Sequence, residues 1–297
     1  MTRTAVVGYG NIGRYAVQSV LAAPDMELAG VVSSRAGSIL PAALQNVPVV
    51  KDIRELQKVD AALLCVPTRR VKEFAQSVLP HGIRTVDSFD IHTEIAGLRG
   101  ELSKTALRYN TVSVVAAGWD PGSDSVIRAL MQAAAPRGVT YTDFGPGMSM
   151  GHTVAAKAID GVADALSLTI PLGTGIHRRN VYVQLKEGAD FKEAEKAIKS
   201  DPYFSRDETH VYEVKEVSAL KDTGHGVKIT RKGTAGITDN QRLAFDMRIS
   251  GPALTAQIMT ACARAAMKRQ PGAYTMIELP LIDLLPGNRE DLIRQLV

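Results

Sequence analysis

The chain has 297 residues, 45% of them hydrophobic and 22% charged, and its formal net charge is +4. This length is sufficient for two domains with buried cores, and the composition is that of a globular protein. The basic residues are scattered, no apolar run is long enough to span a membrane, and the six histidines lack metal-ligand spacing. Since the first apolar strand begins almost at once and leaves no room for a signal peptide, we expect a cytoplasmic protein without nucleic-acid, membrane or metal partners.

The first predicted element is a strand, residues 4–7, that runs directly into Gly8-Tyr9-Gly10-Asn11-Ile12-Gly13. A helix over residues 11–22 follows, with apolar residues at helical spacing. In such a G-x-G-x-x-G turn the first glycine permits the tight turn, the second admits a pyrophosphate and the third allows the helix to pack closely. The motif alone can also mark a flexible loop, but the flanking strand and helix favour a dinucleotide site.

The second predicted strand, residues 26–32, ends in Ser33-Ser34-Arg35. Sites selective for NAD usually carry Asp or Glu at this point, and a carboxylate would repel a 2′-phosphate. Two hydroxyls and a guanidinium can instead hold that phosphate. The alternative is an ordinary polar loop with a solvated arginine. We predict that the cofactor is NADP.

Strands and helices continue to alternate up to about residue 117. Short apolar strands are expected at 60–66, 82–87 and 111–117, with helices at 71–79 and 91–107. Buried strands joined by helices indicate a Rossmann-type, doubly wound parallel sheet, whose ligand sites lie at the carboxyl ends of the strands. The predicted cofactor-binding residues are Gly8, Gly10, Asn11, Ile12, Gly13, Ser33, Ser34, Arg35, Cys65, Pro67, Thr68 and Arg69.

The pattern changes after about residue 137, where many strands alternate apolar and polar residues. This alternation is typical of an antiparallel sheet with one solvated face. One helix begins at an Asp190 cap, with Glu193 completing a capping box, and ends at Asp201-Pro202. A last helix is expected over 252–268. The predicted strands are 139–144, 165–171, 180–185, 210–217, 227–231 and 243–249, so the second domain is α+β.

Three polar clusters lie beyond the glycine-rich turn. Asp90 follows a strand and can either cap the next helix or face a ligand. Trp119 and Asp120 occupy a turn, where they can anchor an ammonium group or form a plain β-turn with a packing tryptophan. Residues 144–152 form a glycine-rich loop whose amides can bind a carboxylate, although a flexible linker has a similar composition.

These clusters carry a resemblance to a known family. The matching stretches are VVGYGNIGR (6–14), PDMEL (24–28), VDSFDIH (86–92), AGWDPGSDS (117–125), FGPGMSMGH (144–152) and PALTAQ (252–257). Over essentially its whole length the chain resembles meso-diaminopimelate D-dehydrogenase. The resemblance implies a homodimer that uses NADP to oxidise the D-configured carbon of meso-2,6-diaminopimelate. The products are L-2-amino-6-oxopimelate and ammonia, and the reaction is reversible by reductive amination.

The resemblance also implies which residues form the site. It places Asp90, Trp119 and Asp120 around the reacting amino-acid centre, where they are the candidate catalytic residues. The substrate-binding residues that it implies are Asp90, Trp119, Asp120, Phe144, Met150, Gly151, Thr169, Arg179, His225 and Gly251, of which Thr169, Arg179 and His225 hold the distal L-centre. Without the resemblance, Arg179 would be interpreted as a solvated strand residue and His225 as a turn residue.

The domain limits and the breadth of the substrate range follow from the same comparison of motifs. We expect a discontinuous nucleotide domain, residues 1–118 plus about 270–297, and a substrate-binding and dimerisation domain, residues 119–269. Many family members carry Gln, Asp and Asn at the positions of Met150, Val154 and Gly251. The lost polar side chains predict a less polar pocket that admits other D-amino acids and 2-oxo acids. The rival interpretations are another two-domain NADP-dependent reductase, such as a dihydrodipicolinate reductase, and a non-catalytic NADP sensor.

Overall fold

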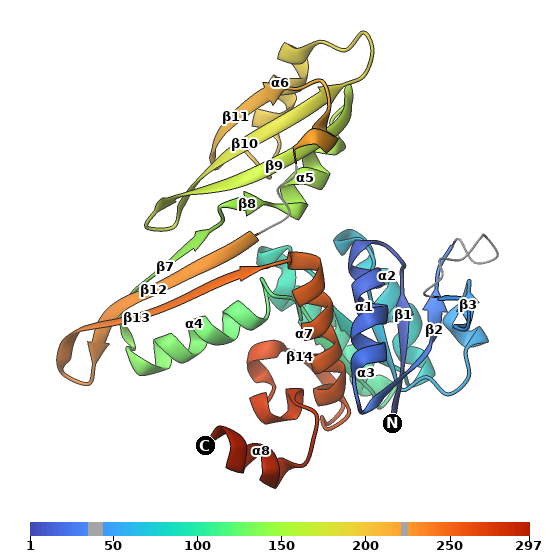
Figure 1. Cartoon of the computed structure of the whole chain (residues 1–297). Coiled ribbons are helices and arrows are strands. Elements are labelled where there is room, and N and C mark those ends of the chain that lie inside the picture. Colours follow the sequence, from blue (N-terminus) through green and yellow to red (C-terminus); the bar gives the residue numbers. More distant parts are fainter. Residues whose placement is uncertain (35–43, 221–224) are drawn as a thin grey trace. The chain divides into compact units, whose positions relative to one another are not determined.

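The computed structural model of the chain describes residues 1–34, 44–220 and 225–297 (Figure 1). These residues form two compact units, the first of Met1–Ala129 with Pro252–Val297 and the second of Leu130–Gly251. The first unit is discontinuous in sequence, because the end of the chain returns to it.

Helix α7 (Gly251–Ala266) lies almost entirely in the first unit, whereas the sequence-based limits assign it to the second domain. Its buried residues Ala256 and Met259 share one hydrophobic cluster with the strand residues Val6 and Leu63. Burial of this apolar face therefore joins the helix to the first unit. The other limit also differs from the expected one, because the boundary falls inside helix α4 (Ser123–Ala134).

A seven-stranded sheet with the order β14-β6-β5-β4-β1-β2-β3 forms the centre of the first unit. All of its strand pairs are parallel, as the Rossmann-type prediction requires. The strands are β1 (Thr2–Val7), β2 (Met26–Val32), β3 (Val49–Val50), β4 (Ala61–Leu64), β5 (Arg84–Asp87), β6 (Val112–Val115) and β14 (Gly272–Thr275). The final strand, from the far end of the chain, pairs with β6 and closes that side of the sheet.

Helices cover both faces of this sheet (Figure 1). Successive side chains of β1 illustrate the arrangement, since Val6 packs in the cluster with α1 and α7, and Val7 packs in the cluster with α2 and α3. The helices of this unit are α1 (Asn11–Ala22), α2 (Val71–Val78), α3 (Ile95–Arg108), α7 and the C-terminal α8 (Arg289–Leu296). The carboxyl ends of β1, β4, β5 and β6 therefore meet at one edge, with the glycine-rich turn among them.

The second unit contains two sheets and is α+β, as predicted. One sheet is antiparallel with the order β13-β12-β7, and the other has the order β11-β10-β9-β8. Its elements are β7 (Arg137–Phe144), β8 (Gly147–Met148), α5 (Met150–Lys157), β9 (Val162–Gly173), β10 (Ile176–Leu185), α6 (Phe191–Ser200), β11 (Glu208–Glu213), β12 (His225–Ala235) and β13 (Thr238–Ile249). Val181, Ile198 and Phe204 are buried in the core of the four-stranded sheet.

Three features of the second unit differ from the prediction. β10 and β11 are parallel, because α6 lies between them as a crossover connection. Asp190 caps α6 by accepting a hydrogen bond from the Glu193 amide at 3.0 Å. The sequence predicted a full capping box, in which the Glu193 side chain would also accept from the Asp190 amide, but α6 has only the first of these bonds among the described contacts. Helix α5 was not expected, and it begins at Met150, inside the segment interpreted as a loop. Helix α4, which spans the boundary of the two units, was not expected either.

Candidate functional site

The glycine-rich turn at the end of β1 has the shape that a dinucleotide requires. Gly8 adopts φ +94°, and a Cβ there would lie 2.3 Å from the carbonyl oxygen of Cys65. A Cβ on Gly13 would lie 2.1 Å from the Gly8 carbonyl oxygen, so α1 packs against the turn. In contrast, nothing lies within 4 Å of a Cβ on Gly10, the residue that precedes the helix. The first amides of α1 therefore face an open approach suited to a pyrophosphate.

The predicted 2′-phosphate contacts follow β2 directly. The Ser33 amide donates to the carbonyl of Val50 at 2.9 Å, which fixes the end of the strand, and Ser34 is exposed. Arg35, the third residue of that prediction, lies outside the described residues. At the two described positions after β2, hydroxyl groups stand where a carboxylate would repel the 2′-phosphate.

Asp90 is held by the neighbouring strand connection and does not cap a helix. The Thr68 hydroxyl donates a hydrogen bond to Asp90 Oδ1 at 2.6 Å, and Asp90 is exposed. Ile91 occupies the N-cap position of the next helical turn and Glu94 that of α3, so the interpretation of Asp90 as a helix cap is wrong. Pro67 and Arg69, also predicted at the cofactor site, are exposed beside Thr68. The loops after β4 and β5 are thus joined at the carboxyl edge of the sheet.

Asp87 joins the Asp90 loop to the loop after β6. Its fully buried Oδ1 accepts hydrogen bonds from the amides of Phe89 at 3.0 Å and Ala116 at 3.1 Å. Burial raises the pKa of this carboxyl to about 6, although both backbone hydrogen bonds favour the ionised form. A Cβ on Gly118 would lie 3.5 Å from Ser88 Cβ, so the two loops are side by side. Asp87 was not selected from the sequence, where it read as the end of a buried strand.

Trp119 and Asp120 belong to a turn that is tied to the start of α4. The Asp124 amide donates to the Trp119 carbonyl at 3.0 Å. Arg128, on the same helix, lies 2.7 Å from Asp124 Oδ2 and 3.4 Å from Asp120 Oδ1. Asp120 and Asp124 therefore share the Arg128 guanidinium, an arrangement that a plain β-turn would not require. Asp90, Trp119 and Asp120 all lie on loops at the same edge of the first unit.

The glycine-rich loop of the second unit is fixed on both sides. The Gly145 amide donates to the Gly226 carbonyl at 2.8 Å, and a Cβ on Gly145 would lie 2.3 Å from the Thr169 carbonyl oxygen. The Phe144 amide donates to His177 Nε2 at 2.6 Å, and burial lowers the pKa of this histidine. These contacts reject the interpretation of the loop as a flexible linker.

Met150 and Gly151 form the first turn of α5. The Ser149 amide donates to the Ser167 carbonyl at 2.9 Å, and Ser149 Oγ lies 2.8 Å from His152 Nδ1. His152 packs edge-on against Tyr203 and Phe204, with ring centroids 5.5 and 5.2 Å away. Burial lowers the pKa of His152 to about 4, so this ring is neutral near pH 7. The start of the helix, where unpaired amides can hold a carboxylate, is thus firmly packed.

Arg179 is oriented by two residues and is buried. Its Nε donates to Asp207 Oδ2 at 2.6 Å, and its Nη1 donates to the hydroxyl of Thr169, which lies directly opposite on β9. The side chain is only 11% exposed, so the solvated interpretation is wrong. Asp207 was missed from the sequence, because nothing local marks it as a partner of a residue 28 positions earlier.

His225 and Gly251 occupy the ends of elements. His225 is the first residue of β12 and pairs with Ile249, so it is not a turn residue, and the adjacent Gly226 holds Gly145. Gly251 is the first residue of α7. The predicted residues thus form two groups, one at the carboxyl edge of the first unit and one around the Gly145 loop of the second unit.

In the described part of the chain, no three His, Cys, Asp or Glu side chains could hold a metal ion, and no helix is both long and apolar enough for a membrane span.

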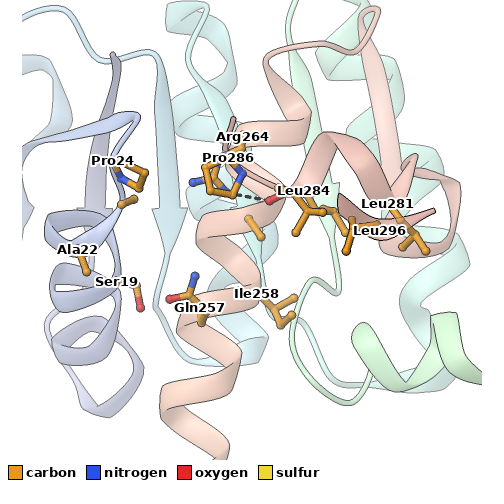
Figure 2. A pocket seen from close by; sticks show the side chains of 13 residues that line it. Ser19, Ala22, Pro24, Gln257, Ile258, Arg264, Leu281, Leu284, Pro286 and Leu296 are labelled. Carbon is orange, nitrogen blue, oxygen red and sulfur yellow. Dashed lines mark hydrogen bonds between the residues drawn. The ribbon is translucent and has the colours of Figure 1, made fainter. Parts of the chain in front are cut away.

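A separate cavity of about 560 Å³ lies between α1, α7 and the C-terminal segment of the first unit (Figure 2). Its lining is mostly apolar and includes Ile258, Leu281 and Leu296. The one guanidinium at its wall, that of Arg264, donates to the Leu284 carbonyl at 2.8 Å and pairs with Asp25. None of the predicted site residues that the structure describes lines this cavity, so it is distinct from the candidate site.

Comparisons with known proteins agree with this arrangement. Residues 2–86 match the oxidoreductase family with an NAD-binding Rossmann fold, and residues 118–177 match the diaminopimelic acid dehydrogenase C-terminal domain. The chain is 61% identical to the meso-diaminopimelate D-dehydrogenase of Bacteroides fragilis over 295 residues, which cover 99% of each protein.

Solved structures give the same result. A C. glutamicum DAP dehydrogenase in complex with DAP has a TM-score of 0.88 and 29% identity, covering 100% of this chain and 99% of that one. An engineered D-amino acid dehydrogenase bound to NADP+ has a TM-score of 0.85, 29% identity and the same coverage. A dihydrodipicolinate reductase from Paenisporosarcina sp. TG-14 covers 94% of this chain and 98% of its own, but at 17% identity and a TM-score of 0.51 it shares the fold alone.

Proposed function

Because the chain belongs to the meso-diaminopimelate D-dehydrogenase family, we propose that it oxidises the D-centre of meso-2,6-diaminopimelate with NADP+. The products are L-2-amino-6-oxopimelate, ammonium and NADPH, and the reverse reaction is a reductive amination. The observation that carries this proposal is the buried Arg179 guanidinium, which Asp207 and Thr169 orient. A planar guanidinium in a fixed orientation suits a carboxylate at the unreactive end of the substrate.

The residues of the first unit fit the cofactor. The open approach at Gly10 and the first turn of α1 would receive the pyrophosphate, and Ser33, Ser34 and Arg35 would hold the 2′-phosphate. When bound, NADP+ supplies the nicotinamide that accepts the hydride. Cys65, Pro67, Thr68 and Arg69 would line the path of the cofactor along the carboxyl edge of the sheet.

At the reacting end, Asp90 and Asp120 would orient the amino group and receive a proton from it. The ammonium group must lose one proton before the α-carbon can release its hydride, since only a neutral amine can donate its lone pair to the forming C=N bond. Water then adds to the resulting iminium carbon, and ammonia leaves with the proton that makes it ammonium. A carboxylate beside the amine can assist both proton transfers, and Trp119 would limit the access of bulk water.

The carboxylate of the reacting centre would bind the amides of Met150 and Gly151 at the start of α5. The distal L-centre would bind Thr169, Arg179 and His225, with Phe144 between the two ends. Holding both ends of the carbon chain presents one α-hydrogen to the cofactor, and this arrangement accounts for the choice of a single centre.

A broader substrate range is a second candidate function. Met150 and Val154 carry no polar group at positions where many relatives have one, and Val154 is 62% exposed. Similarity to an engineered D-amino acid dehydrogenase favours the same idea. Gly251, which lacks the amide common at that position, would also leave room. We expect weaker activity on D-amino acids without a distal carboxylate.

The test is NADPH formation at alkaline pH with meso-, L,L- and D,D-diaminopimelate and with D-alanine, each in turn. Strong activity on the meso form, none on the L,L form and little on D-alanine would support the proposal. Activity spread evenly over D-amino acids would favour the broader enzyme, and no activity on any of the four would favour an NADP sensor.

We also propose a homodimer, which sedimentation would report as twice the chain mass of 31.9 kDa.

A further inference from the structure

We propose that Asp124 is a positioning residue for the reaction, which acts by sharing one proton with Asp120 and so sets the capacity of Asp120 to take up the proton that the substrate amine releases. This inference rests on the proposed function, in which Asp120 meets the reacting amino group. Asp124 itself does not reach the substrate, because its side chain is fully buried.

The geometry joins three side chains in one group. Asp124 follows Asp120 by four residues, and its amide donates to the Trp119 carbonyl at 3.0 Å, so the start of α4 lies beside the Asp120 turn. Arg128 lies 2.7 Å from Asp124 Oδ2 and 3.4 Å from Asp120 Oδ1, so a single guanidinium contacts both carboxyl groups. The Asp120 side chain is 16% exposed and the Asp124 side chain 0%. Asp120 is therefore the member that can meet a ligand, and Asp124 is the member behind it.

The charges of this group favour one shared proton. Two ionised carboxylates beside one guanidinium would leave an uncompensated negative charge in a buried place. Burial, followed by the repulsion from Asp120, raises the pKa of Asp124 to about 8, while Arg128 opposes this effect. The start of α4 also favours the ionised form, as does any helix N-terminus. A hydrogen bond between two carboxyl groups requires one of them to carry a proton.

The proton balance of the proposed reaction uses this group directly. In deamination, the substrate ammonium gives one proton to Asp120, whose acceptor capacity is set by whether Asp124 holds its own proton. When Asp124 is ionised, the pair takes up the released proton and keeps one in total. The proton passes to solvent after the oxo product leaves, and the pair returns to its starting state. In amination, the pair returns the same proton to the nitrogen.

The competing explanation is that Asp124 has a purely structural role in the first turn of α4. Acidic residues are common there, and the Asp124 amide already holds the Trp119 carbonyl. An Asn at position 124 would keep the shape, the backbone contact and a hydrogen-bond donor toward Asp120. It would remove the ionisation and, with it, the charge that pairs with Arg128. Asp124→Asn therefore separates the two roles.

Trp119 is the only tryptophan of the chain and lies beside Asp120, so its fluorescence reports on the pair without substrate. We expect the full-length protein to show a fluorescence transition near pH 8 that Asp124→Asn abolishes. Asp120→Asn should keep the transition but move it down by about one pH unit or more, because the like charge is gone. Asp291→Asn, an exposed carboxyl on α8, serves as the matched control and should leave the transition in place.

The same variants are then compared in their pH–rate profiles with meso-diaminopimelate. We expect the kcat for deamination to rise through the transition near pH 8 in the unsubstituted protein. Asp124→Asn should remove that rise and lower kcat about tenfold or more. A transition that survives Asp124→Asn, or an unchanged pH–rate profile, would overturn the proposal. If Asp124→Asn does not fold, a transition that Asp120→Asn leaves unmoved would overturn it equally. Absence of activity alone would refute the proposed function, and the fluorescence titration would still decide whether the pair shares a proton.

Discussion

Arg179 Nε donates a 2.6 Å hydrogen bond to Asp207 Oδ2, across the junction of the parallel strands β10 and β11. The register places Arg179 opposite Thr209, so Asp207 lies in the turn just before β11. Nη1 of the same guanidinium donates a hydrogen bond to the hydroxyl of Thr169, so two residues fix its orientation.

Replacing Arg179 should weaken binding of the distal carboxylate without affecting the reaction at the D-centre. Charge-assisted hydrogen bonds contribute about 1.5–3 kcal/mol each, so Arg179→Met should lower kcat/KM for meso-diaminopimelate about ten- to a hundred-fold. D-Alanine, which has no distal carboxylate, should lose far less. Asp207→Asn keeps an acceptor oxygen but not its charge, and we expect a smaller loss in the same direction. Steady-state NADPH formation on both substrates measures these effects.

Arg178 provides a matched control for this series. It is the adjacent residue of β10, it is 39% exposed, and it pairs with Glu208 at 2.9 Å. Arg178→Met should therefore leave both substrates nearly unchanged. Equal losses on meso-diaminopimelate and D-alanine in Arg179→Met would remove Arg179 from the distal site.

The Thr68 hydroxyl should matter for the position of Asp90 more than for the affinity of the cofactor. Thr68→Val deletes the donor of the 2.6 Å hydrogen bond while keeping the size of the side chain. We expect kcat to fall about five- to thirty-fold, from about 1–2 kcal/mol of lost orientation, with a small change in KM for NADP+. Thr68→Ser should restore kcat. A raised KM for NADP+ with an unchanged kcat would instead make Thr68 a cofactor ligand only.

The end of β2 should decide which cofactor is used. Ser34→Asp places a carboxylate where the 2′-phosphate is expected, so kcat/KM for NADP+ should fall about ten- to a hundred-fold, while that for NAD+ should hold or rise. Ser77→Asp, at an exposed serine of α2, is the control for added charge. If the ratio of NADP+ to NAD+ activity stays the same in Ser34→Asp, the phosphate lies elsewhere.

Local features of the fold were readable from the sequence. The glycine-rich turn, the bounds of α1 and β2, and the alternation of strands and helices from β1 to β6, except for the short β3, depend on neighbouring residues, so short-range patterns predict them. The short β3 and the C-terminal β14 and α8 were not predicted. Thr169 and Arg179 were selected only because they match family positions that the resemblance implies. Strand pattern alone made Arg179 a solvated residue, since its burial depends on β9 and β11 on either side.

Features that depend on distant partners were not readable. Asp207 acquires its role because α6 carries the chain over and sets β11 parallel to β10, a pairing that alternation cannot distinguish from an antiparallel one. Asp87 and Asp124 lie inside motifs of the family resemblance, but neither was selected. The Asp87 side chain binds the amide of a residue on another loop, and the contacts of Asp124 depend on the turn that precedes it. Asp124 meets Asp120 only after the turn brings the start of α4 back toward it.

Asp87 should make the stability of the first unit depend on pH in an unusual direction. Its folded-state pKa, about 6, lies above the ordinary value of 3.8, so the folded protein holds more protons than the unfolded chain between those values. The contribution of this residue to the free energy of unfolding therefore falls as pH rises through that range, by about 3 kcal/mol in all. Carboxyls with lowered pKa values, such as Asp52 at about 2, contribute with the opposite sign. The effect must accordingly be measured as a difference between two proteins.

Asp87→Asn removes the ionisable group and keeps an oxygen for the amides of Phe89 and Ala116. Its free energy of unfolding minus that of the unsubstituted protein should increase between about pH 4 and pH 7, by up to about 3 kcal/mol. Urea unfolding followed by Trp119 fluorescence, at several pH values, reports the difference in the same unit. Asp291→Asn, on the exposed face of α8, should give a flat difference. A flat difference for Asp87→Asn as well would mean that the Asp87 carboxylate is ionised in the folded protein as readily as in the unfolded chain, with its two backbone hydrogen bonds offsetting its burial.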